Sequence, residues 1–138
     1  MRLILIVDKD VAKTFGIELD SNNRPLRKNG RIVVKRPKGV PPHIQTKFVE
    51  FLDKIEKCEE YNEILSVLRE FQFKSLKASK YTKKLVEISR GLLYRIYGVS
   101  ADSNRIRLLR IKLSRNYRVS LGLWVKENGE VVVFFFGT

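Results

Sequence analysis

Toward its C-terminus the chain holds two hydrophobic segments separated by a tight-turn dipeptide, and this arrangement constrains the fold more than any other feature. In the first segment large apolar residues alternate with other types: Val119, Leu121, Leu123 and Val125 alternate with Arg118, Ser120, Gly122 and Trp124. Asn128-Gly129 follows, a dipeptide typical of two-residue β-hairpin turns, and residues 131–136 are apolar throughout. The alternation predicts a strand with one buried and one open face, whereas the unbroken run predicts a central strand covered on both faces.

A further strand is predicted just before this hairpin, in the segment that follows residues 100–104. Ile106 and Leu108 share one face of it, whereas Leu109, Ile111 and Leu113 share the other. This change of phase at Leu108-Leu109 predicts a β-bulge or a twist, which would re-aim the neighbouring side chains.

The first half of the chain combines a short strand with helices. Residues 3–7 are apolar and partly β-branched, which predicts a buried strand. Pro41-Pro42 then opens a helix whose buried face recurs every three or four residues. That face consists of Ile44, Phe48, Phe51, Leu52, Ile55 and Cys58. The pattern continues to Phe71, either as one long helix or as two helices with a break near residues 59–62. For the ambiguous residues 73–99, we expect a short helix ending near Gly91 and then a strand over residues 92–99.

Residues 20–38 are rich in Asn, Pro, Gly and positively charged side chains. Asn29-Gly30 precedes the β-branched residues 32–34, which predicts a hairpin arm with a tight turn. The arm is either a surface loop or a second contact with a ligand.

These elements predict an α+β fold, in which an N-terminal strand and a helical hairpin pack on a mainly antiparallel, twisted β-sheet. With 138 residues the chain is long enough for one domain with its own core. We expect the strand and the basic arm in residues 1–39, the helical part in 40–90, and the antiparallel sheet with a basic face in 91–138.

The net charge of +13 favours a polyanionic partner. Nucleic acid fits better than a membrane, because no helix combines a basic face with a hydrophobic one. No secretory signal and no apolar stretch of transmembrane length occurs, so we expect a cytoplasmic protein.

Neither a metal nor a cofactor is expected. A single cysteine, Cys58, excludes an internal disulfide and a thiolate-rich zinc site, and His43 is the only histidine. Asp8 and Asp10 follow the first strand, as at the start of a metal-dependent nuclease site. Such a site needs further carboxylates at strand ends, however, and the others cluster along one helix.

Positive charge is densest just before the C-terminal hairpin, where no carboxylate occurs between Asp102 and Glu127. The segment carries Arg105, Arg107, Arg110, Lys112, Arg115 and Arg118. Alternation with apolar residues places several of these cations on one open strand face, near the spacing of successive phosphates. Cations so placed can favour the ionised 2′-hydroxyl of RNA and stabilise a pentacoordinate phosphate without a metal. Trp124 shares a face with Arg118, so it can either stack on a base or pack against the protein.

Several motifs resemble those of the RelE/ParE toxin superfamily. Residues 112–119, Lys-Leu-Ser-Arg-Asn-Tyr-Arg-Val, precede a hydrophobic strand, an Asn-Gly turn and residues 131–137. They are similar to the sheet of these toxins, in which a basic strand leads into a Tyr-Arg pair, a hairpin and a closing strand that ends at a Gly. Upstream, Pro42-His43-Ile44-Gln45 with its helix resembles the helical hairpin of the family, and residues 73–77 resemble its short Lys-x-Leu-Lys connection before the sheet.

The resemblance implies a messenger-RNA interferase, a small metal-independent endoribonuclease that often acts on ribosome-bound transcripts and is neutralised by an antitoxin protein. By position, Arg118 would stabilise the phosphate, and Arg110 and Lys112 would surround the 2′-hydroxyl and the scissile phosphate. Further RNA contacts are expected from Arg105, Arg107, Arg115, Tyr117 and Trp124. Ribonuclease members usually carry a His or Arg and a Tyr just beyond the closing Gly, which is where this sequence ends. Two alternatives remain: a non-catalytic RNA- or DNA-binding module that uses the same basic face, and an inhibitor of DNA gyrase, as in the other branch of the superfamily.

Overall fold

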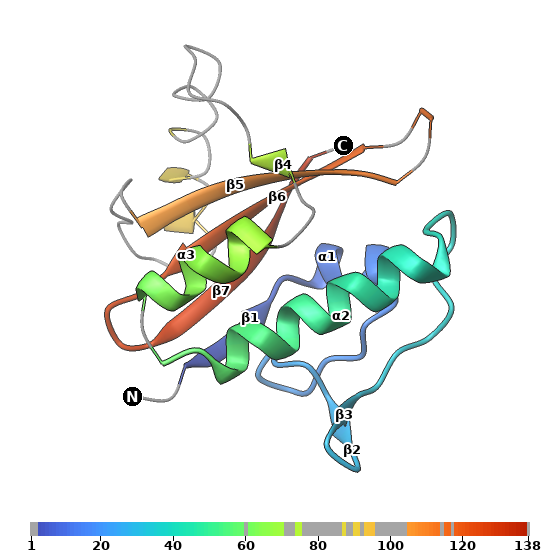
Figure 1. Cartoon of the computed structure of the whole chain (residues 1–138), viewed down its shortest axis with the longest axis horizontal. Helices are drawn as coiled ribbons and strands as arrows, with labels where there is room; N and C mark the ends of the chain where they lie inside the picture. Colours follow the sequence, from blue (N-terminus) through green and yellow to red (C-terminus); the bar gives the residue numbers. More distant parts are fainter. Residues whose placement is uncertain are drawn as a thin grey trace.

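The structure, a computed structural model, describes residues 3–59, 61–70, 74–75, 87, 90–91, 93–95, 105–113, 115–116 and 118–137. Along the chain the elements are β1 (Ile4–Val7), α1 (Lys9–Phe15), β2 (Arg27–Lys28), β3 (Arg31–Ile32), α2 (Pro42–Lys57), α3 (Tyr61–Glu70), β4 (Lys74–Ser75), β5 (Ile106–Lys112), β6 (Arg118–Val125) and β7 (Glu130–Gly137). Figure 1 shows α2 and α3 lying across one face of the larger sheet.

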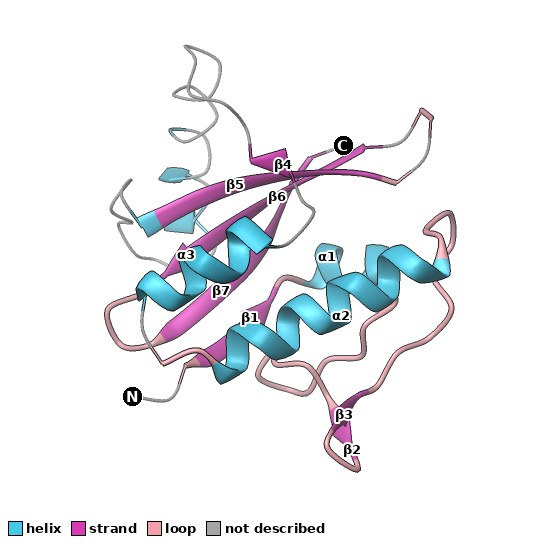
Figure 2. Ribbon diagram, in the orientation of Figure 1, coloured by secondary structure: helices cyan, strands magenta, loops and turns pink. Residues whose placement is uncertain are grey.

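The larger sheet has the strand order β1-β7-β6-β5-β4 (Figure 2). β1 and β7 run parallel, and the other neighbouring strands run antiparallel. The predicted α+β class and the mainly antiparallel sheet are therefore confirmed. The hairpin predicted from Asn128-Gly129 joins β6 to β7. Its turn runs from Lys126 to Gly129, whose N–H donates to the carbonyl oxygen of Lys126 at 3.2 Å, and Gly129 but not Asn128 has a positive φ, of 88°. This geometry is typical of a three-residue hairpin loop rather than a two-residue one.

The main core lies between the helices and one face of this sheet. The sheet contributes odd-numbered strand residues to this core. They include Leu5, Val7, Ile111, Val119, Leu121, Leu123, Val131 and Val133. Phe15 of α1 stacks on Phe48 of α2 with ring centroids 4.0 Å apart. The alternation in β6 and the buried strand at residues 4–7 are thus confirmed, because their apolar positions meet the helices.

The opposite face of the sheet is also covered along part of its length. Ile106, Leu108, Trp124, Val132 and Phe134 are buried there, outside the main core cluster. The predicted open face of β6 is therefore wrong at residues 122–124, where both sides of the strand are buried.

No bulge interrupts the pairing of β5 with β6, which runs without a shift from Ile106 opposite Trp124 to Lys112 opposite Arg118. The predicted bulge at Leu108-Leu109 is wrong for that pairing. Apolar residues occur at both even and odd positions of β5 because both faces of the strand are partly buried. No bulge is needed to explain them. The irregularity of this sheet lies instead in β6 against β7, between Ser120 and Leu121.

Helix α1 was not expected from the sequence, in which Asp8 and Asp10 were weighed as the start of a metal site and not favoured. Asp8 caps this helix, because its Oδ2 accepts a hydrogen bond from the backbone N–H of Asp10 at 3.0 Å. The helix ends at Gly16, whose φ of 67° is left-handed. Asp8 therefore has a structural role in the described fold.

The long apolar pattern after Pro41 divides into α2 and α3, with the break after Lys57, so the two-helix alternative is confirmed. Cys58 at the break is buried, as its helical spacing predicts. The strand predicted over residues 92–99 is wrong at residues 93–95, which are helical; the rest of it lies outside the described residues. Leu93 is buried, whereas Tyr94 is 62% exposed.

The basic arm forms the predicted hairpin, with β2 and β3 joined at Asn29-Gly30. Both turn residues have positive φ, 54° and 76°, as in a type I′ turn. Among the described residues, no helix is long and apolar enough to cross a lipid bilayer.

Candidate nucleic-acid interface

Exposed cations gather where β5 and β6 approach their connecting turn. Lys112 pairs directly with Arg118 across the two strands, and Arg110, two residues earlier, pairs with Ser120. Arg115 is exposed in the turn itself. We call Arg110, Lys112, Arg115 and Arg118 the cationic patch; all four side chains are exposed.

Strand geometry places these charges close together. Cβ atoms of directly opposed residues lie about 5 Å apart, and residues two apart along a strand are separated by about 7 Å. Like charges in direct opposition destabilise a sheet, yet Lys112 faces Arg118. None of the ion pairs in the described part of the chain involves the patch. The patch is therefore a concentration of positive charge without a described carboxylate beside it.

Packing on the other side of the strands orients these cations. Ile111, between Arg110 and Lys112, is buried against the helices, and so is Val119, which follows Arg118. Because successive side chains of a strand point to opposite faces, burial of these two residues fixes their neighbours on the face away from the main core. The sheet therefore holds the three strand cations on one face without requiring a bond between them.

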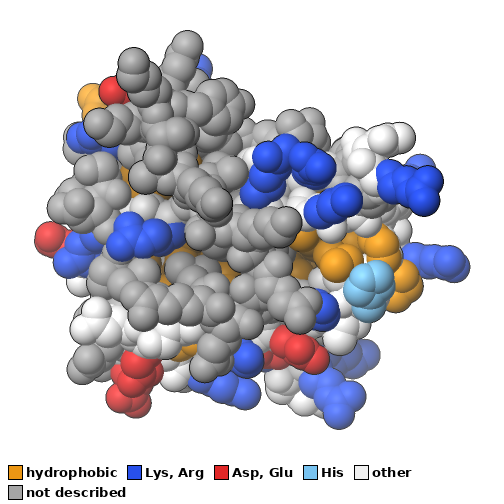
Figure 3. Space-filling model, turned by 45° about the horizontal axis from the view of Figure 1, so that its top comes forward, with side chains coloured by type: hydrophobic (Ala, Val, Ile, Leu, Met, Phe, Trp, Pro, Cys, Tyr) orange, Lys and Arg blue, Asp and Glu red, His pale blue; other side chains and the backbone are white. Residues whose placement is uncertain are grey.

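One view of the molecule shows a wider positive surface (Figure 3). Figure 3 shows Lys and Arg side chains gathered on its right side, where hydrophobic side chains lie among them. In Figure 1 the turn between β5 and β6 and the start of α2 lie on that same side. The acidic side chains drawn on this face lie to the left and in its lower part.

Two other predicted RNA contacts, Arg105 and Arg107, are not part of this patch. Arg107 is half-buried on the helix side of β5, and its Nη1 donates a hydrogen bond to the carbonyl oxygen of Ile106 at 3.1 Å. Arg105 is also half-buried and precedes the strand. Since Arg107 and Lys112 are separated by five residues of extended strand, they lie about 17 Å apart along it.

Trp124 shares the face of the patch but not its exposure. Only 4% of the residue is accessible, and Lys126 Nζ lies 5.1 Å from the ring centroid. Of the two roles considered for this residue, packing against the protein is the one that matches its burial. Tyr117, the other aromatic candidate, lies outside the described residues.

The structure adds two positions that sequence patterns did not indicate. Ser120 lies opposite Arg110, and its half-exposed side chain can donate a hydrogen bond. On the other side of β5, Lys74 of β4 pairs with Arg110. A two-residue strand shows no periodicity, and residues 73–77 resemble a connection between elements, so the sequence holds no clear sign of this pairing.

The described residues include no cluster of three His, Cys, Asp or Glu side chains placed to hold a metal ion. Cys58 lies away from the patch, at the break between α2 and α3, where its Sγ contacts the carbonyl oxygen of Lys54 at 3.0 Å. Burial raises the pKa of its thiol, and the nearby Glu63 carboxylate raises it further. This thiol is therefore a poor nucleophile near neutral pH. What the patch can do chemically is bind phosphates and stabilise negative charge.

Comparison of the chain with models of protein families, with curated proteins and with solved structures finds no match in any of the three.

Proposed function

We propose that this protein is an endoribonuclease of the RelE-like toxin type, which cleaves messenger RNA in the cytoplasm without a metal ion and is neutralised by an antitoxin protein. The observation that carries the proposal is the pairing of Lys112 with Arg118 beside Arg110, on an exposed strand face. The order of elements also supports it. Helices α2 and α3 precede the basic strand β5, a hairpin and a closing strand that ends at Gly137, an order similar to that of the toxins that the sequence resembles.

The chemistry requires stabilisation of negative charge. The ribose 2′-oxygen loses its proton and attacks the adjacent phosphorus, the bond from phosphorus to the 5′-oxygen breaks, and the leaving oxygen takes up a proton. The products are a 2′,3′-cyclic phosphate and a 5′-hydroxyl. Arg118 would hold the charged phosphoryl oxygens, while Arg110 and Lys112 would favour the ionised 2′-oxygen. Because buried neighbours fix these strand positions, the cations need little reorganisation in the transition state.

The test is RNA cleavage in EDTA by the parent chain, by Arg118→Ala, and by the matched control Arg90→Ala, which removes an exposed arginine from a described helical residue. We expect discrete products with 5′-hydroxyl ends from the parent and the control. Loss of one donor to a developing oxyanion lowers a rate by about 100- to 1,000-fold, so Arg118→Ala should leave almost no product. A 2′-deoxy substitution at the cleaved nucleotide should block the reaction. Equal cleavage by the parent and Arg118→Ala would refute the assignment.

A non-catalytic RNA-binding module is the second candidate, and one observation favours it. The described side chains on the exposed part of this strand face are Arg110, Lys112, Arg118 and Ser120. None of these is a histidine, a carboxylate or a tyrosine, the groups that most often transfer protons in such reactions. RNA binding that weakens steeply with salt, with no cleaved product from ribosome-bound or free RNA, would support this candidate.

A further inference from the structure

The basic arm, residues 20–38, carries a second set of exposed cations in addition to the cationic patch. Its hairpin pairs Arg27 with Ile32 and Lys28 with Arg31. Ile32 is 7% exposed and belongs to the main core, so one face of the hairpin is turned inward. Because the side chains of neighbouring strand positions point to opposite faces, Lys28 and Arg31 are turned outward, and both are exposed.

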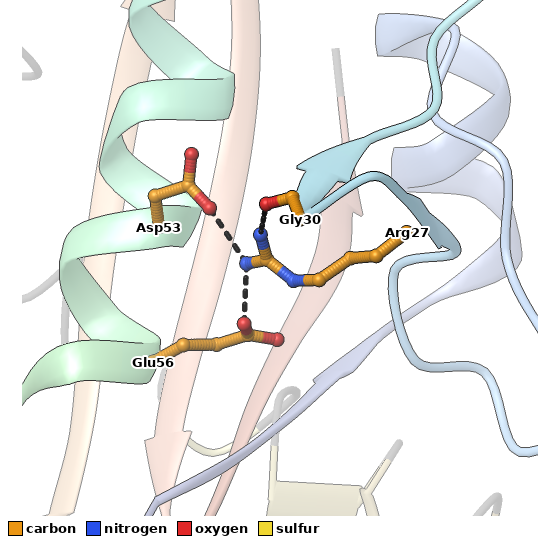
Figure 4. A network of polar contacts seen from close by, with 4 residues as sticks. All are labelled: Arg27, Gly30, Asp53 and Glu56. Carbon is orange, nitrogen blue, oxygen red and sulfur yellow. Dashed lines mark hydrogen bonds and ion pairs between the residues drawn. The ribbon is translucent and has the colours of Figure 1, made fainter.

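The inner face is fastened to α2 through Arg27 (Figure 4). Its guanidinium donates to Asp53 Oδ1 at 2.6 Å, to Glu56 Oε2, and to the carbonyl oxygen of Gly30 at 3.0 Å. Partial burial of the guanidinium opposes its ionisation, but the two carboxylates outweigh this and raise the pKa of Arg27. The tip of the arm is therefore attached to the helix by a shared ion pair.

The base of the arm is held as well. Gln45 Nε2 of α2 donates to the carbonyl oxygens of Phe15 and Lys35, both at 2.8 Å. In the turn closed by the bridge between Leu19 and Pro25, Asp20 Oδ1 accepts hydrogen bonds from the backbone N–H groups of Asn22 and Arg24 at 2.9 and 3.0 Å. The arm is thus a positioned element rather than a free loop.

These attachments also engage the carboxylates around the arm. Asp53 and Glu56 bind Arg27, and Glu18 lies 3.6 Å from Lys35. The remaining basic side chains of the arm are all exposed: Arg24, Lys28, Arg31, Arg36 and Lys38. None of the ion pairs in the described residues involves these five. The outer surface of the arm therefore retains an uncompensated positive charge.

The arm repeats the charge arrangement of the cationic patch. Beside the turn of β2 and β3, Lys28 stands directly opposite Arg31, as Lys112 stands opposite Arg118 in β5 and β6. Opposed like charges cost stability in the free protein, and an anion bound between them removes that cost. The two sites lie on different sides of the molecule, the arm at the bottom of Figure 1 and the turn between β5 and β6 at its upper right.

We propose that the arm is a second phosphate-binding surface for RNA, so that full affinity requires an RNA long enough to contact both the arm and the cationic patch. The proposal rests on the proposed function for its choice of RNA. Phosphate contacts of this kind supply affinity and orientation without reading sequence. The arm therefore determines the length of RNA bound, whereas the patch contacts the scissile phosphate.

The test measures binding of 2′-O-methyl RNA, which cannot be cleaved through the 2′-oxygen, by fluorescence anisotropy in EDTA. Oligonucleotides of about six and about 24 nucleotides distinguish one contact surface from two. Three double variants each remove two charges: Lys28→Gln with Arg31→Gln in the arm, Lys112→Gln with Arg118→Gln in the patch, and Lys9→Gln with Lys13→Gln on α1 as the control. All six side chains are exposed, and urea unfolding verifies that each variant is folded.

Each phosphate contact to single-stranded RNA contributes about 0.7 to the slope of log K against log salt. Loss of two contacts should therefore lower the slope by about 1.4 and the affinity for the long RNA by about 25-fold at roughly 0.1 M salt. We expect this loss for the arm variant on the long RNA, little loss on the short RNA, and little effect of the α1 control on either.

The outcomes separate the two proposals. Arm and control variants that bind the long RNA equally well would overturn the proposal for the arm, whatever the patch variant does. If the arm variant loses affinity but the patch variant binds like the control, the arm is supported as a phosphate-binding surface, whereas the requirement for contact with both surfaces and the proposed cleavage site are contradicted. If the parent chain binds neither RNA, both are overturned.

Discussion

Replacing Gly122 with alanine would place a methyl carbon against the ring of Phe134, its direct partner on β7. A Cβ atom at this position would lie 2.1 Å from Cζ and 2.5 Å from both Cε atoms of that ring. To reach an ordinary contact of about 3.5 Å, the ring would have to move by about 1.4 Å. Phe134 is 2% exposed, so the ring has no open space into which to move.

Overpacking of this kind costs about 1–3 kcal/mol, and removal of a strand glycine returns about 0.5–1 kcal/mol. We therefore expect Gly122→Ala to lower the free energy of unfolding by roughly 1–2 kcal/mol. With a urea m-value of about 2 kcal/mol/M, the unfolding midpoint should fall by roughly 0.5–1 M.

Equilibrium unfolding in urea tests this expectation, with Gly91→Ala as the matched control. A Cβ atom at Gly91 meets nothing within 4 Å, so that variant should be as stable as the parent or more stable. Adding Phe134→Leu to Gly122→Ala should recover part of the loss, because the smaller side chain makes room for the methyl group. A parent-like midpoint for Gly122→Ala, or strictly additive effects in the double variant, would show that the two residues do not compete for space.

Three further predictions concern charged and titrating groups. Arg27→Met should lower stability by at most about 1 kcal/mol, because the ion pair is partly solvated, and should make the arm more rapidly cut by trypsin. The raised pKa of Cys58 predicts slow alkylation by iodoacetamide in the folded protein. The pKa of the Cys58 thiol is higher in the folded than in the unfolded protein, so its contribution to stability is complete below about pH 8.5 and is lost as the pH rises through the folded pKa. The urea midpoint should therefore fall as the pH is raised above about 8.5. Lys112→Glu should raise stability by about 0.2–1 kcal/mol, since it places a carboxylate opposite Arg118, while RNA binding measured by anisotropy weakens.

The C-terminal sheet could be predicted from the sequence because its burial follows local rules. In β6 the side chains that meet the helices recur with a period of two, and Asn128-Gly129 specifies the turn after it. Alternation also predicts several cations on one open strand face, but the pairing of Lys112 with Arg118 and the separation of Arg105 and Arg107 from the cationic patch come from the structure.

Other features depend on contacts between distant parts of the chain. The second buried layer, which covers Trp124, leaves no sign in the pattern of β6 itself. Helix α1 has seven residues, too few to establish a helical period, although Asp8 and Gly16 mark its two ends. The bond from Arg27 to Asp53 joins residues 26 positions apart, and nothing local distinguishes Arg27 from the exposed cations around it.

One end of the β5–β6 pair is apolar and the other is charged, and packing at the apolar end fixes the position of the strands at the charged end. At the apolar end, Ile106 and Trp124 are paired and buried on the face opposite the helices. Packing on both faces fixes the two strands there, so their course toward the turn does not rely on attraction between Lys112 and Arg118. The repulsion between those cations is therefore offset by packing elsewhere in the sheet. A phosphate that binds between them meets two strand positions already in place, so the affinity that it gains is reduced by ordering the two side chains but not by ordering the backbone.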